Sequence, residues 1–420
     1  MPSTPTPTTT SPILAPFTLP NGSVLPNRLA KAAMEENMAV RGQLPGAALF
    51  RLYETWSRGG VGLIVTGNVM VHAEALTGPA GVVLDAHSPL EPFQRWAAAA
   101  KSGGAKVWMQ INHPGRQILA DMPGVAWGPS AIKVDIGKNS KRFADPVAMT
   151  AEQIEQTVER FAETARRAEE AGFDGVEIHA AHGYLLSQFL SPLTNQRTDH
   201  WGGTLDNRAR LLLDITRAVR AVVAPTFAVA VKLNSADFQR GGFDADDAAR
   251  VITMLAPLGV DIVELSGGSY EAPAMTGQAG DERSRAREAY FLTLAEDLAA
   301  TSPLPLMLTG GIVRRPVAEE VLSGGIELVG MGSALAVDPD LPNRWRQDAT
   351  AKVDLTPVTI KDKAVASAAG MARIRQQLRR LGADRRPRPG INPILALVKE
   401  TVLQRFALRR YRTWLNGRAA

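Results

Sequence analysis

The sequence predicts an α/β protein built as a (β/α)8 TIM barrel. Short apolar runs rich in β-branched residues alternate with stretches of helical periodicity, and eight strand–helix units can be read in order. Polar or glycine-rich segments follow the ends of the predicted strands, as expected where a barrel carries its active site. The alternative is an open doubly wound sheet, but no Gly-x-Gly-x-x-Gly opens the first helix.

Each element is predicted from local pattern. Before the first strand, Phe17–Leu25 has a hairpin pattern with Asn21-Gly22 at its turn, and we expect it to close the bottom of the barrel as a lid. The predicted strands are Arg28–Met34, Gly62–Val69, Lys106–Ile111, Gly175–His179, Ala228–Leu233, Asp261–Leu265, Leu304–Leu308 and Glu327–Gly330. The clearest predicted helices are Ala151–Ala171, Asp206–Ala224, Ala245–Leu258 and Pro316–Ser323.

Three segments lie outside this repeat. Residues 1–12 form a Ser/Thr/Pro tract that we expect to be disordered, and residues 13–350 form the barrel. The stretch 112–150 is too long for a simple connection, so we interpret it as a capping loop after the third strand. Residues 351–420 form a basic helical C-terminal extension, with helices predicted over Lys363–Leu381 and Pro393–Trp414.

Composition limits the class of protein. The chain of 420 residues has no cysteine, which excludes disulfides and thiolate metal or iron–sulfur sites and fits a cytoplasmic location. The N-terminus lacks a secretory signal pattern, and no apolar run is long enough to span a membrane. The net charge of +5 is unevenly distributed. Residues 361–420 hold 15 Lys and Arg against 3 Asp and Glu, whereas the rest of the chain holds 32 against 39.

The most informative polar cluster follows the fourth predicted strand. His179 would stand at the strand's end, with His182 and Tyr184 just beyond it. Two imidazoles there could hold an electronegative atom, while the phenol supplies a proton to its neighbour. As catalytic and substrate-binding candidates we therefore take His179, His182 and Tyr184.

Other strand ends suggest a ligand with a functional ring and a phosphate. Gln110 offers a donor and an acceptor that match the imide edge of a flavin, and Lys232 would place a positive charge near the flavin N1 and O2. The last three strand ends are rich in small residues whose backbone N–H groups suit a phosphate. These candidate residues are Gly268, Gly310, Gly311, Gly332 and Ser333.

Several of these motifs together resemble the Old Yellow Enzyme family, over about residues 14–342. They are Asn27-Arg-Leu-Ala-Lys-Ala-Ala-Met34, Gln110-Ile-Asn-His-Pro-Gly-Arg116, the segment Gly172–Leu186 and the segment Phe189–Asp199. The resemblance implies an FMN-dependent NAD(P)H oxidoreductase that reduces activated C=C bonds of α,β-unsaturated carbonyl compounds by ping-pong turnover. It implies that Ala33, Met34 and Glu35 run along the flavin with Gly67 beside it. It also implies that His179 and His182 bind the substrate carbonyl, and that Tyr184 donates the proton.

Three positions depart from the family pattern. Glu35 stands where the family often has Thr, Ser or Cys, and a carboxylate there would disfavour the reduced flavin anion unless it turns away or is protonated. Lys232 replaces a frequent Arg. Ser333 replaces a phosphate-binding Arg, for which Arg314 or Arg315 is the candidate substitute.

Two other functions stay open at this point. One is a metal-dependent hydrolase or lyase that uses His179 and His182, with His113 or Glu177 as a further group. The other is a flavin-binding barrel whose ene-reductase activity is altered or lost. For Lys232 the simpler interpretation is a salt bridge with Glu264 or Asp237.

We expect a small-molecule enone as partner, no nucleic acid, and in principle a homo-oligomer. For the basic extension, packing on the barrel or on a second subunit comes first. A membrane-surface helix comes next, with Leu403, Phe406, Ala407, Arg410 and Trp414 at helical spacing.

Overall fold

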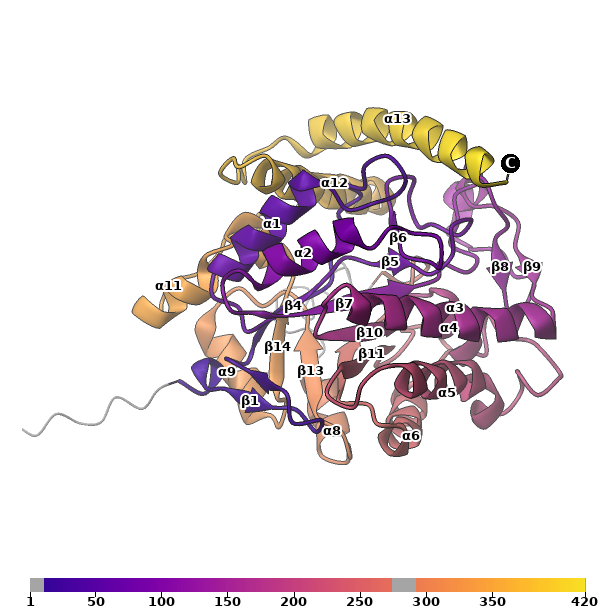
Figure 1. Ribbon diagram of the computed structural model, residues 1–420, viewed down its shortest axis with the longest axis horizontal. Coiled ribbons are helices and arrows are strands. Elements are labelled where there is room, and N and C mark those ends of the chain that lie inside the picture. Colours follow the sequence, from indigo (N-terminus) through magenta and orange to yellow (C-terminus); the bar gives the residue numbers. More distant parts are fainter. Residues whose placement is uncertain (1–10, 274–291, 420) are drawn as a thin grey trace, which may run out of the picture.

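Eight parallel strands close into a barrel, which confirms the predicted fold class (Figure 1). The computed structural model describes residues 11–273 and 292–419, so residues 1–10 of the predicted N-terminal tract lie outside the described part. Each strand pairs in parallel with the next, and the ring closes because the last strand pairs with the first. In order the strands are β3 (Leu29–Lys31), β4 (Leu63–Val65), β7 (Lys106–Asn112), β10 (Gly175–Ala180), β11 (Ala228–Asn234), β12 (Ile262–Ser266), β13 (Leu306–Thr309) and β14 (Leu328–Met331).

Helices cover the outside of the barrel. The 20-residue helix α3 begins with a capping box in which Thr150 and Gln153 satisfy each other's backbone N–H groups. Its buried side chains recur at helical spacing and pack against the strands and α5. The helices of the barrel are α1 (Ala47–Arg58), α2 (Glu91–Lys101), α3 (Ala151–Glu170), α4 (Leu185–Leu190), α5 (Leu205–Val222), α6 (Ala245–Leu255), α8 (Leu292–Ala299), α9 (Arg315–Ser323), α10 (Ser333–Val337) and α11 (Leu341–Gln347).

The amino-terminal hairpin closes the bottom of the barrel, as predicted. Strands β1 (Phe17–Thr18) and β2 (Val24–Leu25) pair antiparallel, and the Asn21 N–H donates to Asp261 Oδ1 at 3.0 Å, just before β12. Leu19 and Leu25 join the buried cluster that fills the lower barrel. The lower barrel is therefore a packed apolar core, and polar chemistry is left to the other end.

Two strands are shorter than predicted. The run Gly62–Val69 divides into β4 and a separate strand β5 (Val69–Met70), which pairs with β7 and with β6 (Val82–Val83). The break has a physical cause, because the Gly67 N–H is bound by the Tyr53 hydroxyl at 2.8 Å and by Glu36 rather than by a neighbouring strand. The first strand likewise ends at Lys31 instead of Met34.

The long segment after β7 folds back over the carboxyl ends of the strands. It contains β8 (Trp127–Gly128), a 3-10 turn over Gly137–Arg142, and β9 (Val147–Ala148), which pairs with β8. Arg116 fastens it, because this buried guanidinium binds Glu271 at 2.5 Å beyond β12 and donates to the main-chain oxygen of Ile132. This segment is thus anchored as the predicted cap.

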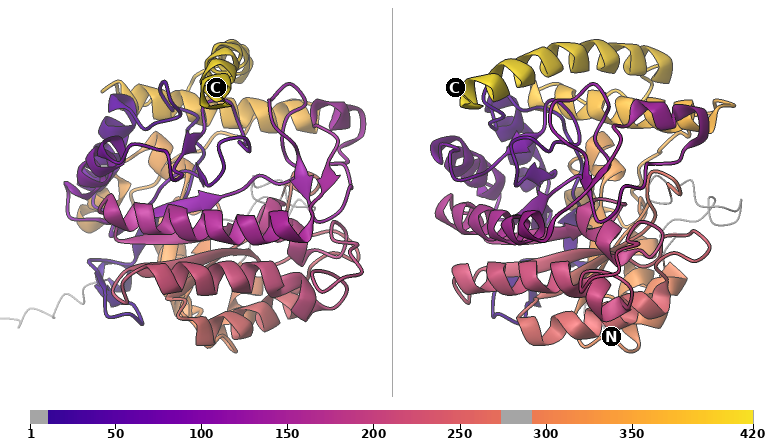
Figure 2. Two further views of the ribbon diagram at one scale, coloured as in Figure 1. Left: turned by 45° about the vertical axis from the view of Figure 1, so that its right-hand side comes forward. Right: turned by 90° about the vertical axis from the view of Figure 1, so that its right-hand side faces the viewer.

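The C-terminal extension forms two helices, α12 (Lys363–Gly382) and α13 (Pro393–Ala419), that pack on each other. They lie across the end of the barrel at which the strands terminate (Figures 1 and 2). Tyr411 of α13 is fully buried and donates to the main-chain oxygen of Ala73 at 2.8 Å. Within the described residues, no helix is long and apolar enough to cross a membrane.

Candidate active site

A layer of buried polar side chains lies inside the barrel above its apolar core. Gln110 Nε2 donates to Glu177 Oε1 at 2.6 Å, and Lys232 forms an ion pair with Glu264. Thr309 Oγ1 also donates to Glu264, at 2.7 Å. All five residues belong to barrel strands, so β7, β10, β11, β12 and β13 together build this layer.

The pKa values of the two carboxyl groups in this layer shift in opposite directions. Burial, followed by the charge of Glu264, raises the pKa of Glu177 well above its usual range. Although burial alone would raise the pKa of Glu264, the neighbouring Lys232 ammonium lowers it to about 2. In the described structure, Glu177 Oε2 and Glu264 Oε2 are buried without a hydrogen-bond partner. The opposite pKa shifts leave a neutral Glu177 beside an ionised Glu264, which balances the charge of Lys232.

Three rings gather at the end of β10, where the sequence predicted the catalytic cluster. The ring centroids of His179 and His182 are 5.0 Å apart, as are those of His179 and Tyr184. The chain turns sharply here because His182 and Gly183 both adopt positive φ, 62° and 72°. A Cβ atom at Gly183 would lie 2.9 Å from the Cβ of Ser269, so only glycine fits this turn.

Both imidazoles are neutral. Burial, followed by the charge of Lys232, lowers the pKa of His182 to about 3, and burial also holds the pKa of His179 well below its usual range. His179 Nδ1 accepts the N–H of Ala181 at 3.2 Å, so in the neutral ring Nε2 carries the proton. His182 Nε2 pairs with Ser266 Oγ at 2.7 Å. His179 is thereby fixed as a hydrogen-bond donor without a charge.

A second tyrosine, missed by sequence reasoning, contacts the proton-donor candidate. The hydroxyls of Tyr184 and Tyr270 are 3.1 Å apart. Burial, followed by the neighbouring Tyr270, raises the pKa of Tyr184 well above its usual range. Burial and the charge of Glu35 raise the pKa of Tyr270 to about 12. Both phenols therefore keep their protons at neutral pH.

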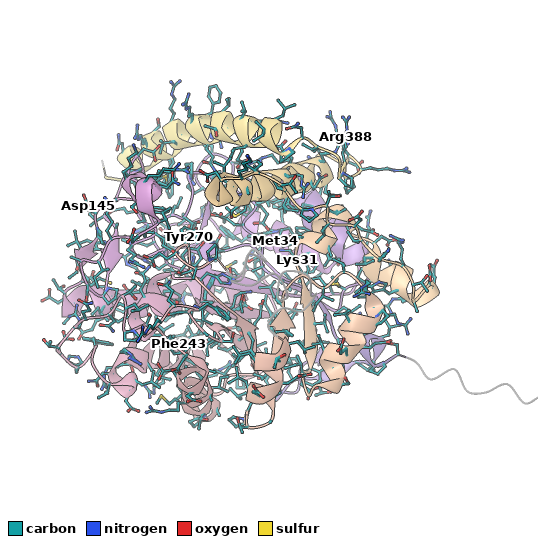
Figure 3. The ribbon with its side chains drawn as sticks, turned by 180° about the vertical axis from the view of Figure 1, so that it is seen from behind. Lys31, Met34, Asp145, Phe243, Tyr270 and Arg388 are labelled. Atoms are coloured by element: carbon teal, nitrogen blue, oxygen red, sulfur yellow. The ribbon has the colours of Figure 1, made fainter. Side chains whose placement is uncertain are left out.

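Glu35 turns toward the C-terminal extension. Its carboxylate forms an ion pair with Arg375 of α12 and accepts the hydroxyl of Thr77. Arg375 lies 3.6 Å from Glu400 of α13. Met34 and Tyr270 lie below α12 in Figure 3. The side chain that departs most from the family pattern is therefore held by a helix outside the barrel, which the sequence did not reveal.

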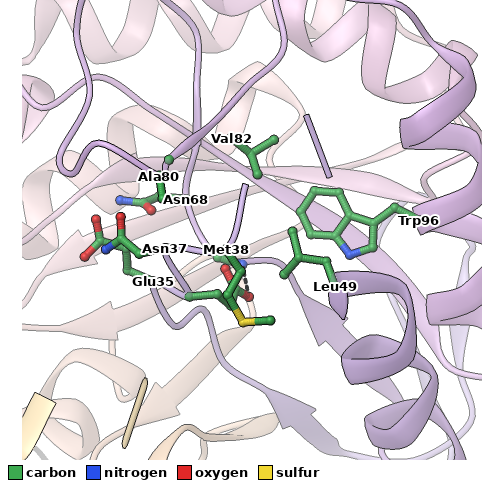
Figure 4. A pocket seen from close by; sticks show the side chains of 11 residues that line it. Glu35, Asn37, Met38, Leu49, Asn68, Ala80, Val82 and Trp96 are labelled. Atoms are coloured by element: carbon green, nitrogen blue, oxygen red, sulfur yellow. Dashed lines mark hydrogen bonds between the residues drawn. The ribbon is translucent and has the colours of Figure 1, made fainter. Parts of the chain in front are cut away.

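Behind Glu35, a buried cluster outside the barrel wall supports the end of β3. Lys31 Nζ donates to the main-chain oxygen of Val65 at 2.8 Å, lies 3.8 Å from Glu36, and stands 4.4 Å from the ring centre of Trp56. Burial lowers the pKa of Lys31 to about 8. A small cavity of about 10 Å³ lies between Glu35, Asn68 and Trp96, with room for one water molecule (Figure 4).

The glycine-rich loops lie side by side after neighbouring strands. Thr309 of β13 pairs with Gly330 of β14, so Gly310-Gly311 and Gly332-Ser333 follow adjacent strand ends. Gly268 follows β12 and is bound by its N–H to the main-chain oxygen of Ala236 at 3.1 Å. Arg315 binds Glu319 at 2.9 Å and the main-chain oxygen of Trp345, which commits it to α9 and α11 rather than to these loops.

The alternative of a metal site gains no support from the geometry. In the described ranges, no group of three or more His, Asp or Glu side chains is arranged to hold an ion. His113 stacks on His72, with ring centroids 5.9 Å apart, and Glu177 is engaged with Gln110. By contrast, Asn112 ends β7 with both amide atoms buried and unpartnered in the described structure, so this strand end has polar capacity left for a ligand.

The comparison with protein families decides the assignment. Residues 12–351 match the NADH:flavin oxidoreductase / NADH oxidase family. The chain belongs to this family. The family's name states electron transfer between NADH and flavin, so the FMN cofactor and nicotinamide reductant implied by the resemblance are confirmed at family level.

Individual relatives agree. The NADH-dependent flavin oxidoreductase iliE of Hypocrea jecorina (strain QM6a) is 36% identical over 352 residues, covering 78% of this chain and 87% of that protein. The iliE protein of Neonectria sp. (strain DH2) is 38% identical, but this chain spans only 46% of its length. The NADH oxidase of Thermoanaerobacter brockii is 32% identical over 77% of this chain and 49% of that protein.

Solved structures support the fold. The old yellow enzyme homologue from Zymomonas mobilis matches with a TM-score of 0.69 and 25% identity, over 81% of this chain and 94% of that one. A 2-naphthoyl-CoA reductase matches with a TM-score of 0.75 over 92% of this chain and 57% of that one, at 24% identity, which speaks for the fold alone.

The residues present fit FMN. Polar side chains that can meet a flavin ring (Gln110, Asn112 and Lys232) lie on β7 and β11, the two strands that flank β10, and the glycine loops follow β12, β13 and β14. Lys232 lies within the barrel and forms an ion pair with Glu264, the simpler interpretation left open by the sequence. The N–H of Gly67 already donates to Tyr53 and Glu36. Gly67 would therefore contact a ligand through its other atoms and not through this N–H.

Proposed function

We propose that this protein is an ene-reductase, which reduces the C=C bond of α,β-unsaturated carbonyl compounds with electrons from NADH or NADPH. One observation carries the proposal: His179, His182 and Tyr184 converge within 5.0 Å ring distances at one strand end. Two neutral imidazoles beside a protonated phenol suit a carbonyl oxygen and the carbon next to the one that takes the hydride. NADH is the reductant named for several relatives, which favours it over NADPH.

The cofactor would be held by Ala33, Met34, Glu35 and Gly67 along one side and by Gln110 and Lys232 at its pyrimidine edge. Gly268, Gly310, Gly311, Gly332 and Ser333 would surround its phosphate with small side chains. When bound, FMN supplies hydride transfer. Because the Lys232 charge is balanced by Glu264, the site presents little net charge from this layer.

In this proposal the protein's own residues bind and protonate the substrate. The Nε2–H of His179 donates to the substrate carbonyl oxygen, since its Nδ1 is occupied by Ala181. His182, held by Ser266, orients the same oxygen. Tyr184 gives its hydroxyl proton to the α-carbon. Tyr270 holds the Tyr184 oxygen and can return a proton to it from the partly exposed side.

The test begins with the visible absorption of the dialysed protein, which should show bound flavin. NADH should then bleach the flavin without oxygen, and 2-cyclohexenone should restore the oxidised spectrum. The double variant His179→Ala/His182→Ala should keep FMN and lose reoxidation by the enone. Normal cyclohexenone reduction by this variant would refute the assigned roles. Reoxidation of the wild type by oxygen but not by any enone would favour a flavin protein with altered chemistry.

A further inference from the structure

The outer face of α13 is an unusual surface. The three most exposed large apolar side chains in the described chain all lie on it: Leu395 (68%), Phe406 (60%) and Val398 (57%). Ile394 and Val402 join them, at 44% and 45% exposure. Positions 394, 398, 402 and 406 are each one helical turn apart, so these side chains form one continuous stripe along the helix. We call this set the α13 stripe.

The exposure of the α13 stripe does not result from poor packing of the helix. The opposite face of α13 buries Ala396, Glu400, Ala407 and Tyr411 against α12 and the barrel loops. The face proposed from sequence alone was therefore wrong in part, because Ala407 is buried and Arg410 donates to the main-chain oxygen of Ala39. Although one face of α13 is packed against the protein, a second apolar face of the helix is exposed. Exposed apolar patches of this kind usually mark a binding surface.

The exposed charged side chains of α13 itself are all positive. Lys399, Arg405 and Arg409 are exposed beside it. Glu400 is the only acidic residue of α13, and it is buried and paired with Arg379 and Arg375. An apolar stripe bordered by cations and free of anions matches a membrane surface that carries anionic headgroups over an apolar interior.

We propose that α13 docks the protein onto an anionic lipid surface, with the α13 stripe inserted at the level of the acyl chains and the flanking cations on the headgroups. A second copy of the chain fits less well. Two stripes related by a two-fold axis would bring Lys399 and Arg405 of one copy toward the same cations of the other. Docking would turn the strand-end face of the barrel, which α13 crosses, toward the membrane (Figure 2).

The test uses the full-length holoprotein and sedimentation with vesicles, so it does not depend on the proposed reaction. Wild type should bind phosphatidylcholine vesicles containing phosphatidylserine, more weakly with phosphatidylcholine alone, and less as salt is raised. The variant Leu395→Gln/Phe406→Gln should lower this binding about 10-fold or more, and Arg405→Gln/Arg409→Gln by a similar factor. The control is Val24→Gln, an apolar site on the bottom hairpin that is 48% exposed, which should bind like wild type.

Flavin content and NADH oxidation should be unchanged in all these variants. Absence of wild-type binding to the anionic vesicles would overturn the proposal, as would equal binding by the stripe variant. Light scattering supplies the competing outcome: a wild-type dimer that becomes a monomer in the stripe variant would assign the surface to a second copy instead.

Discussion

Arg375, on a helix outside the barrel, forms an ion pair with Glu35 at the end of the first barrel strand. Glu35 is the residue that sequence comparison marked as unfavourable beside a reduced flavin. The structure resolves that difficulty, since the carboxylate is turned to a guanidinium and to the Thr77 hydroxyl. The extension therefore takes part in the electrostatics of the site.

Removing this pairing should be measurable. Arg375→Gln leaves the partly buried Glu35 unpaired, so we expect a loss of about 1–2 kcal/mol in stability and a lower flavin reduction potential. Glu35→Gln/Arg375→Gln should recover most of both, because it removes both charges. Denaturant titration and dye-coupled potentiometry test this. Additive effects of the two single substitutions would show that the pair is not coupled.

The two buried carboxyls should respond unequally to substitution. Glu177→Gln mimics the protonated acid and should cost no more than about 1 kcal/mol. Glu264→Gln leaves Lys232 buried without its counter-ion and should cost about 3 kcal/mol or more. Urea unfolding of the two variants distinguishes them. Equal destabilisation would argue against a neutral Glu177 beside an ionised Glu264.

Because the pKa values of both imidazoles are lowered, we expect enone binding to be independent of pH near neutrality. His182, with a pKa of about 3, and His179 stay neutral from pH 5 to 8. The dissociation constant of a neutral enone, measured by flavin absorbance changes, should therefore be constant over this range. A rise in affinity below pH 6.5 would mean that a protonated imidazole binds the carbonyl.

Substitution of each tyrosine should change the rates of the two half-reactions to different extents. Tyr184→Phe should slow enone-dependent reoxidation roughly 100-fold or more, with little change in reduction by NADH. Tyr270→Phe should slow the same step less, because Tyr184 keeps its own proton for transfer. Stopped-flow absorbance of each half-reaction provides the measurement. A slower reductive step in Tyr184→Phe would remove it as the acid.

Because Lys31 is buried, the free energy of unfolding should depend on pH in the alkaline range. The unfolded chain holds this proton up to about pH 10.5, whereas the folded protein releases it near pH 8, so the group's contribution to stability rises as pH increases between these values. Lys31→Met keeps the apolar stem against Trp56 and should abolish this rise, about 3 kcal/mol in all. Unfolding of both proteins at pH 7, 8.5 and 10 would show it; parallel curves would contradict the assignment.

The sequence predicted the barrel well because strand patterns and helical periods are local. Its three main site candidates are also local, since His179, His182 and Tyr184 all follow one strand. The strand ends were less predictable. Apolar residues continue past Lys31, and after Val65 the backbone N–H of Gly67 is taken by side chains from elsewhere.

Partnerships between distant segments could not be predicted. Nothing near Tyr270 or Arg375 in the sequence marks them as neighbours of Tyr184 and Glu35. A second signal did exist for the carboxyl pair: Glu177 and Glu264 each stand mid-strand in an apolar run, and a buried acid requires a partner. The sequence also could not show which apolar face of α13 packs against the protein, because the two faces have similar composition.

The family match ends at residue 351, before α12 begins, yet α12 determines the surroundings of Glu35. A change at position 35 or at position 375 alone therefore leaves a partner unpaired, even though one residue lies within the family match and the other beyond it. Exchanging this extension between relatives would change the charges near the cofactor. Chimaeras that keep the barrel intact should therefore still differ in flavin reduction potential.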